Sequence, residues 1–415
     1  MERPYYHSDE IRDSAERETA LMALLPQIVA AAQRDAPAYG ESLAGIHAAE
    51  INSRVALAQL PVTRKSELIA LQRQRPPFGG FTTVATNMVA RVFASPGPIY
   101  EIEARRPDFF RMARALYAAG IRAGDLIHNT FSYHLTPAGA MLESAALALG
   151  CSVIPAGTGQ TELQLQTIAD LRPTAYVGTP SFLKILCDRS SETGVDIASI
   201  KKALVGAEAF PGALRAEFQA RGIAALQCYG TADLGLIAYE TRSPTGALCD
   251  GMVVDEGVIL ELVEPGTGTP VAPGEVGEVV VTTLTPEYPL LRFATGDLSA
   301  LLVEPSPCGR TNQRIKGWLG RADQSAKVRG MFVHPVQIGE IARRHPAVRR
   351  ARLVIERPQS ADAMTLLVET ETPAESEAIA ATAQAVTKLR TEIACVPIGS
   401  LPQDGKLIED RRPIG

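Results

Sequence analysis

Short apolar runs alternate with segments of helical periodicity between residues 108 and 226, and this alternation restricts the fold more than any other feature of the chain. The runs expected to be strands are residues 126–131, 151–155, 204–209 and 223–226, and residues 175–181 are expected to be a strand followed by a turn. The segments expected to be helices are residues 108–120, 140–149, 161–171, 182–189 and 211–219. Because a strand–helix–strand crossover joins parallel strands, the pattern predicts an α/β domain with a parallel sheet covered by helices.

The segments on either side of this alternation predict additional layers and a second domain. Residues 8–36 have apolar positions at helical spacing, and Ser8 stands where it can cap that helix. Residues 248–310 read as short strands and turns, which predicts a small β-barrel-like subdomain within the large domain. Beyond them the sequence predicts helices at residues 336–344 and 375–392 and strands at residues 351–356 and 364–369. We therefore expect an N-terminal domain of residues 1–322 and a small α+β C-terminal domain of residues 323–415.

Composition excludes several classes of protein. The chain has 415 residues, of which 46% are hydrophobic and 21% charged, so it can bury a substantial core. The formal charge of −5 argues against a nucleic-acid partner. No apolar run approaches the length of a membrane span, and the polar start does not resemble a signal peptide. That lack of a long apolar run predicts no membrane partner. Because the six cysteines are scattered along a long chain, we expect reduced thiols and a cytoplasmic location.

The stretch from Cys228 to Gly235 has the composition of a ligand-binding turn. Apolar residues 223–226 precede it, Tyr229-Gly230 is expected to end the strand, and Asp233 follows. A glycine at a strand end lets the backbone approach a ligand, and a carboxylate beyond it can hold a metal ion or a hydroxyl group. A plain turn with a solvated aspartate explains the same residues, so this stretch alone leaves both interpretations open.

Three stretches further along the chain change that balance. They are Phe293–Leu298 with Thr-Gly-Asp, Gly320–Asp323 with Gly-Arg-x-Asp, and Leu401–Lys406 with Gly-Lys. Together with Cys228–Gly235 they resemble the motifs of the adenylate-forming superfamily, and from about Leu60 onward the chain is most similar to the phenylacetate–CoA ligase family. The resemblance implies a ligase that converts a carboxylic acid and ATP into an acyl-AMP and transfers the acyl group to CoA, with Mg²⁺ as a cofactor and a mobile C-terminal domain.

The same resemblance implies the residues of a nucleotide site. Asp297 would accept the two ribose hydroxyls, for which a carboxylate with two oxygens is a natural partner, and Asp233 would reach Mg²⁺. Lys65 would reach the phosphates, although an exposed lysine in the first turn of a helix, with Thr63 or Ser66 as its cap, is the alternative. The full set implied for the nucleotide is Lys65, Ser95, Gly206, Ala207, Glu208, Cys228, Tyr229, Gly230, Thr231, Asp297 and Arg321.

Other residues follow from the resemblance for the remaining steps. Lys406 would be the catalytic residue, because its positive charge offsets the negative charge that develops during adenylation. Asp323 matches the hinge at which the small domain turns. Tyr133 and Thr136 would line the pocket for the acyl group, with packing in the core as the alternative for Tyr133. A homodimer is a further expectation.

The sequence also departs from the family pattern at three places. Where the family carries a phosphate-binding loop rich in Ser, Thr and Gly and ending in Lys, this chain has Ser95-Pro96-Gly97-Pro98, and each proline removes an N–H donor. Ala232 lacks the hydroxyl that the family usually has. Only Cys249 and Cys308 occupy the region in which the family can bind zinc with four ligands, so we expect no zinc.

Two other functions fit much of the same pattern. One is an enzyme that forms an acyl-AMP but passes the acyl group to an amine or a carrier protein. The other is a ligand-binding protein that has lost ATP chemistry, which the altered loop and Ala232 favour and which Asp297, Arg321 and Lys406 oppose. The identity of the carboxylic acid is not specified by the sequence beyond an aryl or small organic acid, which the family resemblance suggests.

Overall fold

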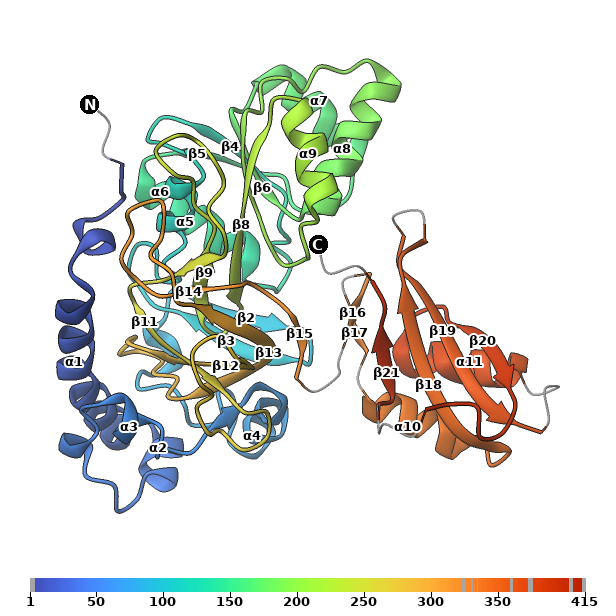
Figure 1. The fold of residues 1–415 in the computed structure, drawn as a ribbon. Helices are drawn as coiled ribbons and strands as arrows, with labels where there is room; N and C mark the ends of the chain where they lie inside the picture. Colours follow the sequence, from blue (N-terminus) through green and yellow to red (C-terminus); the bar gives the residue numbers. More distant parts are fainter. Residues whose placement is uncertain are drawn as a thin grey trace. The chain divides into compact units, whose positions relative to one another are not determined.

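The computed structural model describes residues 4–322, 326–329, 331–333, 335–358, 361–371, 376–402 and 406–412. These residues form two compact units that divide between Trp318 and Leu319 (Figure 1). Each unit has a hydrophobic core of its own, and the core of the smaller unit draws on residues between Ala326 and Ile408.

Five parallel strands form one half of the main sheet in the N-terminal unit. In spatial order they are β5 (Ser152–Pro155), β4 (Leu126–Asn129), β6 (Ala175–Gly178), β7 (Lys202–Val205) and β8 (Ala224–Thr231). The helices between and before them are α5 (Ala113–Ala118), α6 (Ala138–Leu149), α7 (Thr161–Leu171), α8 (Pro180–Thr193) and α9 (Gly212–Ala220). The predicted α/β class is confirmed.

Helices cover both faces of these strands because successive strand residues point to opposite faces. In β6, Ala175 and Val177 pack in the core that includes α5 and α6, whereas Tyr176 packs in the core that α7, α8 and α9 build. The latter three helices lie together beside the parallel strands (Figure 1).

Antiparallel strands extend the same sheet from β8. They are β9 (Gly235–Tyr239), β10 (Met252–Val254), β11 (Val258–Val263), β12 (Val276–Thr283), β13 (Phe293–Leu302) and β14 (Arg314–Ile315), with the order β11-β12-β13-β14-β10-β9-β8. The strands predicted to form a β-barrel-like subdomain therefore hydrogen-bond in series to the parallel half. The short strand β1 (Thr63–Arg64) pairs with β13.

The prediction that Tyr229-Gly230 ends the strand is wrong. β8 continues to Thr231 and pairs with β9, with an irregularity in register between Tyr229 and Gly230. A Cβ atom at Gly230 would lie 2.5 Å from the carbonyl oxygen of Gly235. Glycine is therefore required here by the close approach of β9, since a side chain would collide with the neighbouring backbone.

Several helix boundaries also differ from the prediction. The first long helix, α1 (Ser14–Asp35), is capped by Asp13, and Ser8 belongs instead to a short 3₁₀ turn, η1 (Ser8–Ile11). The helix predicted from residue 108 begins at Ala113, because Asp108 adopts a positive φ of 47° and its carboxylate accepts from the Ala113 amide.

Around the predicted start at Thr63 or Ser66, the chain forms β1, a 3₁₀ turn η3 (Lys65–Glu67) and then α4 (Leu68–Gln74). Neither Thr63 nor Ser66 caps these elements, since η3 and α4 have no capping bond from a side chain.

A layer of N-terminal helices, α1 with α2 (Pro37–Ser42) and α3 (Arg54–Leu57), is tied to the strands by buried polar contacts. Arg17 of α1 is 3% exposed, and its Nε donates to Glu256 Oε2 at 2.7 Å. The same guanidinium donates to the Asp9 carbonyl and to Thr311 Oγ1, each at 2.8 Å. Apolar residues of α1, among them Leu25 and Val29, join the main core.

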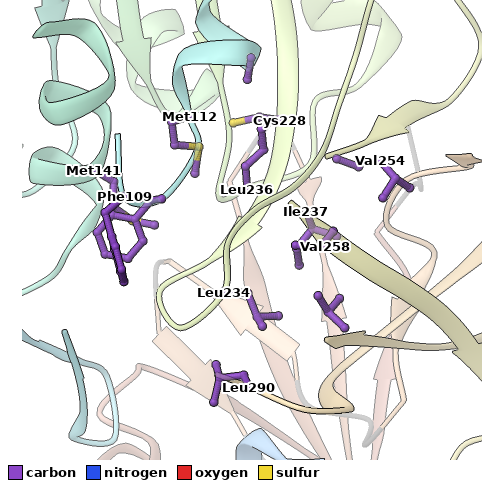
Figure 2. Packing of buried hydrophobic residues seen from close by; sticks show 14 of the residues in the cluster. Phe109, Met112, Met141, Cys228, Leu234, Leu236, Ile237, Val254, Val258 and Leu290 are labelled. Carbon is purple, nitrogen blue, oxygen red and sulfur yellow. The ribbon is translucent and has the colours of Figure 1, made fainter. Parts of the chain in front are cut away.

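The main core includes residues of the turn between β8 and β9 and of the two strands themselves. Figure 2 shows Cys228 and Leu236 on these two strands, and it shows Leu234 from the turn near Leu290. Leu234 directly follows Asp233 and is 2% exposed. The apolar packing of Leu234 therefore anchors the loop that carries the Asp233 carboxylate.

The C-terminal unit contains a four-stranded sheet with the order β20-β19-β18-β21. Its elements are β15 (Gly320–Arg321), β16 (Ala326–Val328), β17 (Met331–Val333), α10 (Pro335–Arg344), β18 (Val348–Glu356), β19 (Ala363–Thr370), α11 (Ser376–Thr387), β20 (Glu392–Val396) and β21 (Ile408–Asp410). The helix predicted to reach residue 392 ends at Thr387, and β20 follows. Within the described parts of both units, no helix is long and apolar enough to cross a membrane.

Candidate active site

Asp297 lies on β13 and is held at both carboxylate oxygens. Tyr229 Oη donates to Oδ2 at 2.9 Å, and Trp318 Nε1 donates to Oδ1 at 3.0 Å. The Asp297 amide donates to Thr295 Oγ1 at 3.1 Å, which fixes the turn of the backbone. The structure thus brings together Tyr229 and Asp297, two of the residues predicted for the nucleotide. At 9% exposure, Asp297 is not the solvated aspartate of a plain turn.

Trp318 is a member of this cluster that the sequence analysis did not assign to the site. It is the only tryptophan in the chain, and it stands two residues before the Gly320-Arg321 motif. The sequence does contain an indication of this role, because a single tryptophan next to a motif has an indole N–H that needs a hydrogen-bond partner.

Lys65 and Asp233 form an ion pair between η3 and the turn after β8. The Lys65 side chain is 28% exposed, whereas the Asp233 side chain is fully buried. Asp233 is therefore not a solvated turn residue, and Lys65 is not the unpaired surface lysine of the alternative interpretation. Among the described residues Asp233 Oδ1 has no hydrogen-bond partner, so one buried carboxylate oxygen remains available to a ligand.

The charges around Lys65 stabilise its protonated form. Removal of solvent lowers the pKa of the Lys65 ammonium, but Asp233, Glu101 and Asp297 oppose that effect, and the net shift of the pKa is upward. One cation thus faces three carboxylates that belong to β3, the β8–β9 turn and β13. This arrangement connects the Asp297 cluster to the Lys65–Asp233 pair.

Glu101 is the third carboxylate, and the sequence analysis missed it. It lies on β3 (Ile99–Glu103) and is fully buried. Its carboxylate accepts a short hydrogen bond from Ser95 Oγ and a second one from the Ser95 amide at 3.3 Å. Burial, with a smaller contribution from the Asp233 charge, raises the pKa of Glu101 to about 8.

Ser95 ends β2 (Arg91–Ser95), which pairs with β3 in a tight antiparallel hairpin. The predicted phosphate loop is therefore a three-residue turn, Pro96-Gly97-Pro98, between paired residues Ser95 and Ile99. A Cβ atom at Gly97 would lie 3.0 Å from Ile99 Cγ1 and 3.1 Å from Ile69 Cδ1, so the turn is packed against apolar side chains.

The turn predicted to face adenine follows β7. Gly206 lies against Cys228, since a Cβ atom at Gly206 would be 3.1 Å from the Cys228 sulfur. Ala207 adopts a positive φ of 66° and is exposed, and the Glu208 carbonyl accepts from Gln227 at 2.8 Å. The structure therefore joins Gly206 to Cys228. Thr231 Oγ1 accepts from the Leu234 amide at 3.1 Å, which closes the turn before β9.

The two residues predicted for the acyl pocket lie in the loop between β4 and α6. Tyr133 Oη accepts from Asn129 Nδ2 at 2.7 Å, and Thr136 Oγ1 donates to the Ser132 carbonyl at 3.3 Å. The Tyr133 ring packs against Gly139, where a Cβ atom would be 2.8 Å from the ring. Both side chains are half-buried, so the ring position is set by contacts on both sides.

Three predicted residues belong to the C-terminal unit. Arg321 is partly buried in β15, and Lys406 is exposed just before β21. Asp323, the predicted hinge, lies outside the described residues. Their roles remain predictions from the sequence.

Cys249 and Cys308 are both buried and lie close enough to influence each other. Ser306 and Cys308 are hydrogen-bonded at 3.0 Å. Although burial opposes ionisation, the hydroxyls of Ser306 and Thr241, together with Arg310, give the Cys308 thiol a net lowered pKa. Among the residues that the structure describes, no group of three or more His, Cys, Asp or Glu side chains could hold a metal ion.

Comparisons with known proteins agree with this arrangement. The family of AMP-binding enzymes matches residues 108–285. Over 366 residues the chain is 33% identical to the phenylacetate-coenzyme A ligase of Thermus thermophilus, which covers 84% of this chain and 80% of that protein. It is 34% identical over 312 residues to the phenylacetate-coenzyme A ligase of Escherichia coli, which covers 72% of this chain and 69% of that protein.

Solved structures share the fold. A 2-hydroxyisobutyryl-CoA ligase in complex with 2-HIB-AMP and CoA superposes with a TM-score of 0.83 at 24% identity, covering 99% of this chain and 93% of that one. An amide bond synthetase from Marinactinospora thermotolerans superposes with a TM-score of 0.55 at 18% identity, covering 78% of this chain and 68% of that one. At these identities the two likenesses bear on the fold alone.

Proposed function

Because the chain belongs to the phenylacetate–CoA ligase family of AMP-binding enzymes, we propose that it joins a carboxylic acid to CoA through an acyl-AMP formed from ATP. The observation that carries the proposal is the cluster of Tyr229, Asp297 and Trp318, with Lys65 close enough to Asp297 to feel its charge. An acid held by two donors offers preoriented acceptor oxygens to the vicinal hydroxyls of a ribose.

The reaction consists of two displacements. A carboxylate oxygen of the acid attacks the α-phosphorus of ATP, a new P–O bond forms, and the bond to the β-phosphate oxygen breaks so that pyrophosphate leaves. The CoA thiol then loses its proton and attacks the acyl carbon, and AMP leaves with the electrons of the C–O bond. Neither step requires a covalent bond to the protein, so orientation and charge carry the catalysis.

Residues of the N-terminal unit would orient the nucleotide. Asp297 would accept from the ribose hydroxyls and Tyr229 would flank the adenine, together with the exposed Ala207 in the turn after β7. Lys65 would neutralise a phosphate oxygen. Tyr133 and Thr136 would line the acyl pocket.

A divalent cation fits the site at one point. The buried Asp233 Oδ1, which has no partner among the described residues, is a hard oxygen donor of the kind that Mg²⁺ prefers. Asp233 would hold the ion, and Mg²⁺ supplies positive charge to phosphate oxygens when bound.

Residues of the C-terminal unit complete the proposal. Lys406 would offset negative charge on the reacting carboxylate and α-phosphate during adenylation, and Arg321 would contact the nucleotide. Rotation at Asp323, in the proposed boundary between residues 1–322 and 323–415, would exchange the faces of the small domain between the two steps. We further expect an aryl or small organic acid as substrate, a cytoplasmic location and a homodimer.

The first test is ATP–pyrophosphate exchange with a panel of aryl and short-chain acids in the absence of CoA. We expect exchange with at least one acid and, once CoA is added, release of AMP with formation of that acyl-CoA. AMP release only with an amine or a carrier protein would replace CoA as the acceptor. Absence of both exchange and thioester formation from supplied acyl-AMPs, in folded protein, would contradict the proposed function.

A further inference from the structure

The β2–β3 hairpin leaves little in this site to bind a triphosphate. Its turn has three residues, and two of them are prolines without an N–H group, so Gly97 is the single backbone donor within the turn. Loops that bind phosphate chains need several converging N–H groups and a nearby cation. The turn is also fixed in its packed form, because Gly97 lies against Ile69 and Ile99.

An internal carboxylate already uses the donors next to the turn. The Ser95 hydroxyl and the Ser95 amide both donate to Glu101, which is fully buried on the neighbouring strand. These are donors of the type that a phosphate oxygen would require. A phosphate at this position would have to displace the Glu101 carboxylate and would then lie beside it.

The positive charge of Lys65, like the Ser95 donors, is already bound to a carboxylate of the protein. Lys65 is paired with Asp233, whose side chain is fully buried. Glu101 and Asp233 are themselves close enough for each charge to affect the other, and both face the buried hydroxyl of Tyr288, which has no hydrogen-bond partner among the described residues. In this cluster the single cation, Lys65, is therefore already paired with a carboxylate of the protein. The cluster contains more carboxylates than cations, and its other members are Ser95, Glu101, Asp233 and Tyr288.

We propose that Glu101, beside the Lys65–Asp233 pair, takes the place of the β- and γ-phosphates. The site would then bind AMP and acyl-AMP, which carry one phosphate, in preference to ATP. This inference rests on the proposed function for the location of the nucleotide. Glu101 acts on specificity by occupying the Ser95 donors and, once it ionises, by its charge, and it needs no contact with the ribose or the adenine.

Calorimetric titration of the full chain with AMP and with ATP, at a pH above the Glu101 pKa of about 8, at equal Mg²⁺ concentration and without an acid, tests the preference directly. We expect AMP to bind at least about tenfold more tightly than ATP, since additional phosphate charges beside internal carboxylates are unfavourable. In the variant Glu101→Gln the hydrogen bond to Ser95 can persist while the charge is lost. We expect that variant to bind ATP more tightly and AMP as before, so that the ratio of the two Kd values falls at least about threefold.

Glu103→Gln is the matched control. Glu103 lies two residues away on the same strand, is also buried, and is paired with Arg91 at 2.7 Å. Its substitution should leave the ratio of the two Kd values unchanged, and thermal unfolding of both variants verifies that they fold.

Each outcome of this comparison is decisive. ATP bound as tightly as AMP by the unaltered protein overturns the inference and leaves the proposed ligase intact. A preference for AMP that is the same in Glu101→Gln and in the unaltered protein overturns the role of Glu101. Failure to bind either nucleotide removes the nucleotide site itself, and with it both the proposed function and the inference.

Discussion

Two carboxylates of the candidate site, Asp297 and Glu101, differ in their hydrogen-bond partners. Asp297 accepts an O–H from Tyr229 and an N–H from Trp318, so each of its oxygens has a donor. Among the described residues Glu101 accepts hydrogen bonds only from Ser95, and its burial favours the neutral form. The first carboxylate suits the binding of ligand hydroxyls, and the second occupies the Ser95 donors and repels additional negative charge once it ionises.

The raised pKa of Glu101 should make the protein less stable as the pH rises. The folded-state pKa is about 8 and the ordinary value is 4.5, so between these values the folded state binds more protons than the unfolded state. The free energy of unfolding therefore falls as the pH increases through this window. Glu101→Gln should remove this contribution and exceed the unaltered protein in stability by on the order of 2 kcal/mol above the window.

Urea unfolding across the window measures this difference. The groups that face Glu101 are Lys65, Asp233, Ser95 and Tyr288, and they are present in both proteins. Asp108, whose pKa burial raises to about 7, changes stability in the same direction in both proteins and cancels in the comparison. A constant difference in stability at all pH values would show that Glu101 does not ionise in this range.

Substitution of Asp297 should weaken nucleotide binding without unfolding the chain. In Asp297→Asn the charge is lost and one oxygen becomes an NH₂ group, so Trp318 can donate to the remaining oxygen while Tyr229 Oη can accept from the amide. We expect AMP to bind about ten- to a hundredfold more weakly, because charge-assisted hydrogen bonds contribute roughly 1.5–3 kcal/mol. Calorimetry with AMP measures the loss. Thr295→Ser, on the same strand, retains its hydroxyl and should bind AMP normally, and equal loss in both variants would point to a general disturbance of β13.

The site residues that can be predicted from the sequence are those in short motifs of unusual composition. Asp297 and Tyr229 are each next to a glycine in such a motif, Asp233 is two residues from one, and the structure brings Asp297 and Tyr229 together. Glu101 could not be found in the same way, because it occurs in an ordinary alternating strand and acquires its character only from burial beside Ser95. Its significance depends on the hairpin register, which places Phe93 opposite it and Ser95 within reach.

At the scale of secondary structure, the chain's alternation of strands and helices predicts the sheet well and its boundaries less well. Helix α7 spans the residues predicted for it. β8 runs further than predicted because Gly230 has no side chain and β9 can therefore pair closely with it. The residue pattern of one strand does not reveal such a pairing. No strands are predicted from the sequence on either side of Ser95-Pro96-Gly97-Pro98, but β2 and β3 pair there, and both prolines lie within the turn.

Helix α1 should depend on its buried ion pair. In Arg17→Met the Glu256 carboxylate would lose its 2.7 Å partner while remaining 9% exposed, and Arg12 at 3.4 Å and Arg114 are cations that stay nearby. Loss of one partner from a buried pair costs about 3–5 kcal/mol, and we expect a loss of about 3 kcal/mol because these two arginines remain. Chemical denaturation measures the change.

The surface pair of Arg34 and Asp35, at the end of the same helix, is the control. Arg34→Met should change stability by less than about 1 kcal/mol because exposed ion pairs contribute little. Equal effects of the two substitutions would mean that burial does not set the strength of the α1 anchor.

At the scale of the whole molecule, the two units have separate cores, so each can keep its fold while the other changes orientation. The sequence predicts two domains from the Gly320–Asp323 motif and the change in pattern after it. In the proposed reaction, the positions of Lys406 and Arg321 would depend on a rotation of one unit relative to the other, and no local pattern of residues specifies such a rotation.

Lys406→Ala should separate the two half-reactions. We expect formation of acyl-AMP from ATP and acid to fall by about a hundredfold or more, because one positive charge is removed from the developing negative charge. Conversion of supplied acyl-AMP and CoA into acyl-CoA should stay within about threefold of the unaltered rate, because that step does not require this charge. Lys388→Ala, on the same unit, should spare both rates, and equal loss of both half-reactions in Lys406→Ala would remove Lys406 from adenylation.

The hydrogen bond between Trp318 and Asp297 gives the protein an intrinsic optical signal. Since Trp318 is the only tryptophan, all indole fluorescence of the chain comes from one side chain, which is bonded to the proposed ribose acceptor and is the last residue before the chain passes into the C-terminal unit. Any ligand that competes for Asp297 changes the environment of that indole. Occupancy of the site can therefore be followed in real time by emission spectroscopy, without a label or a coupled assay.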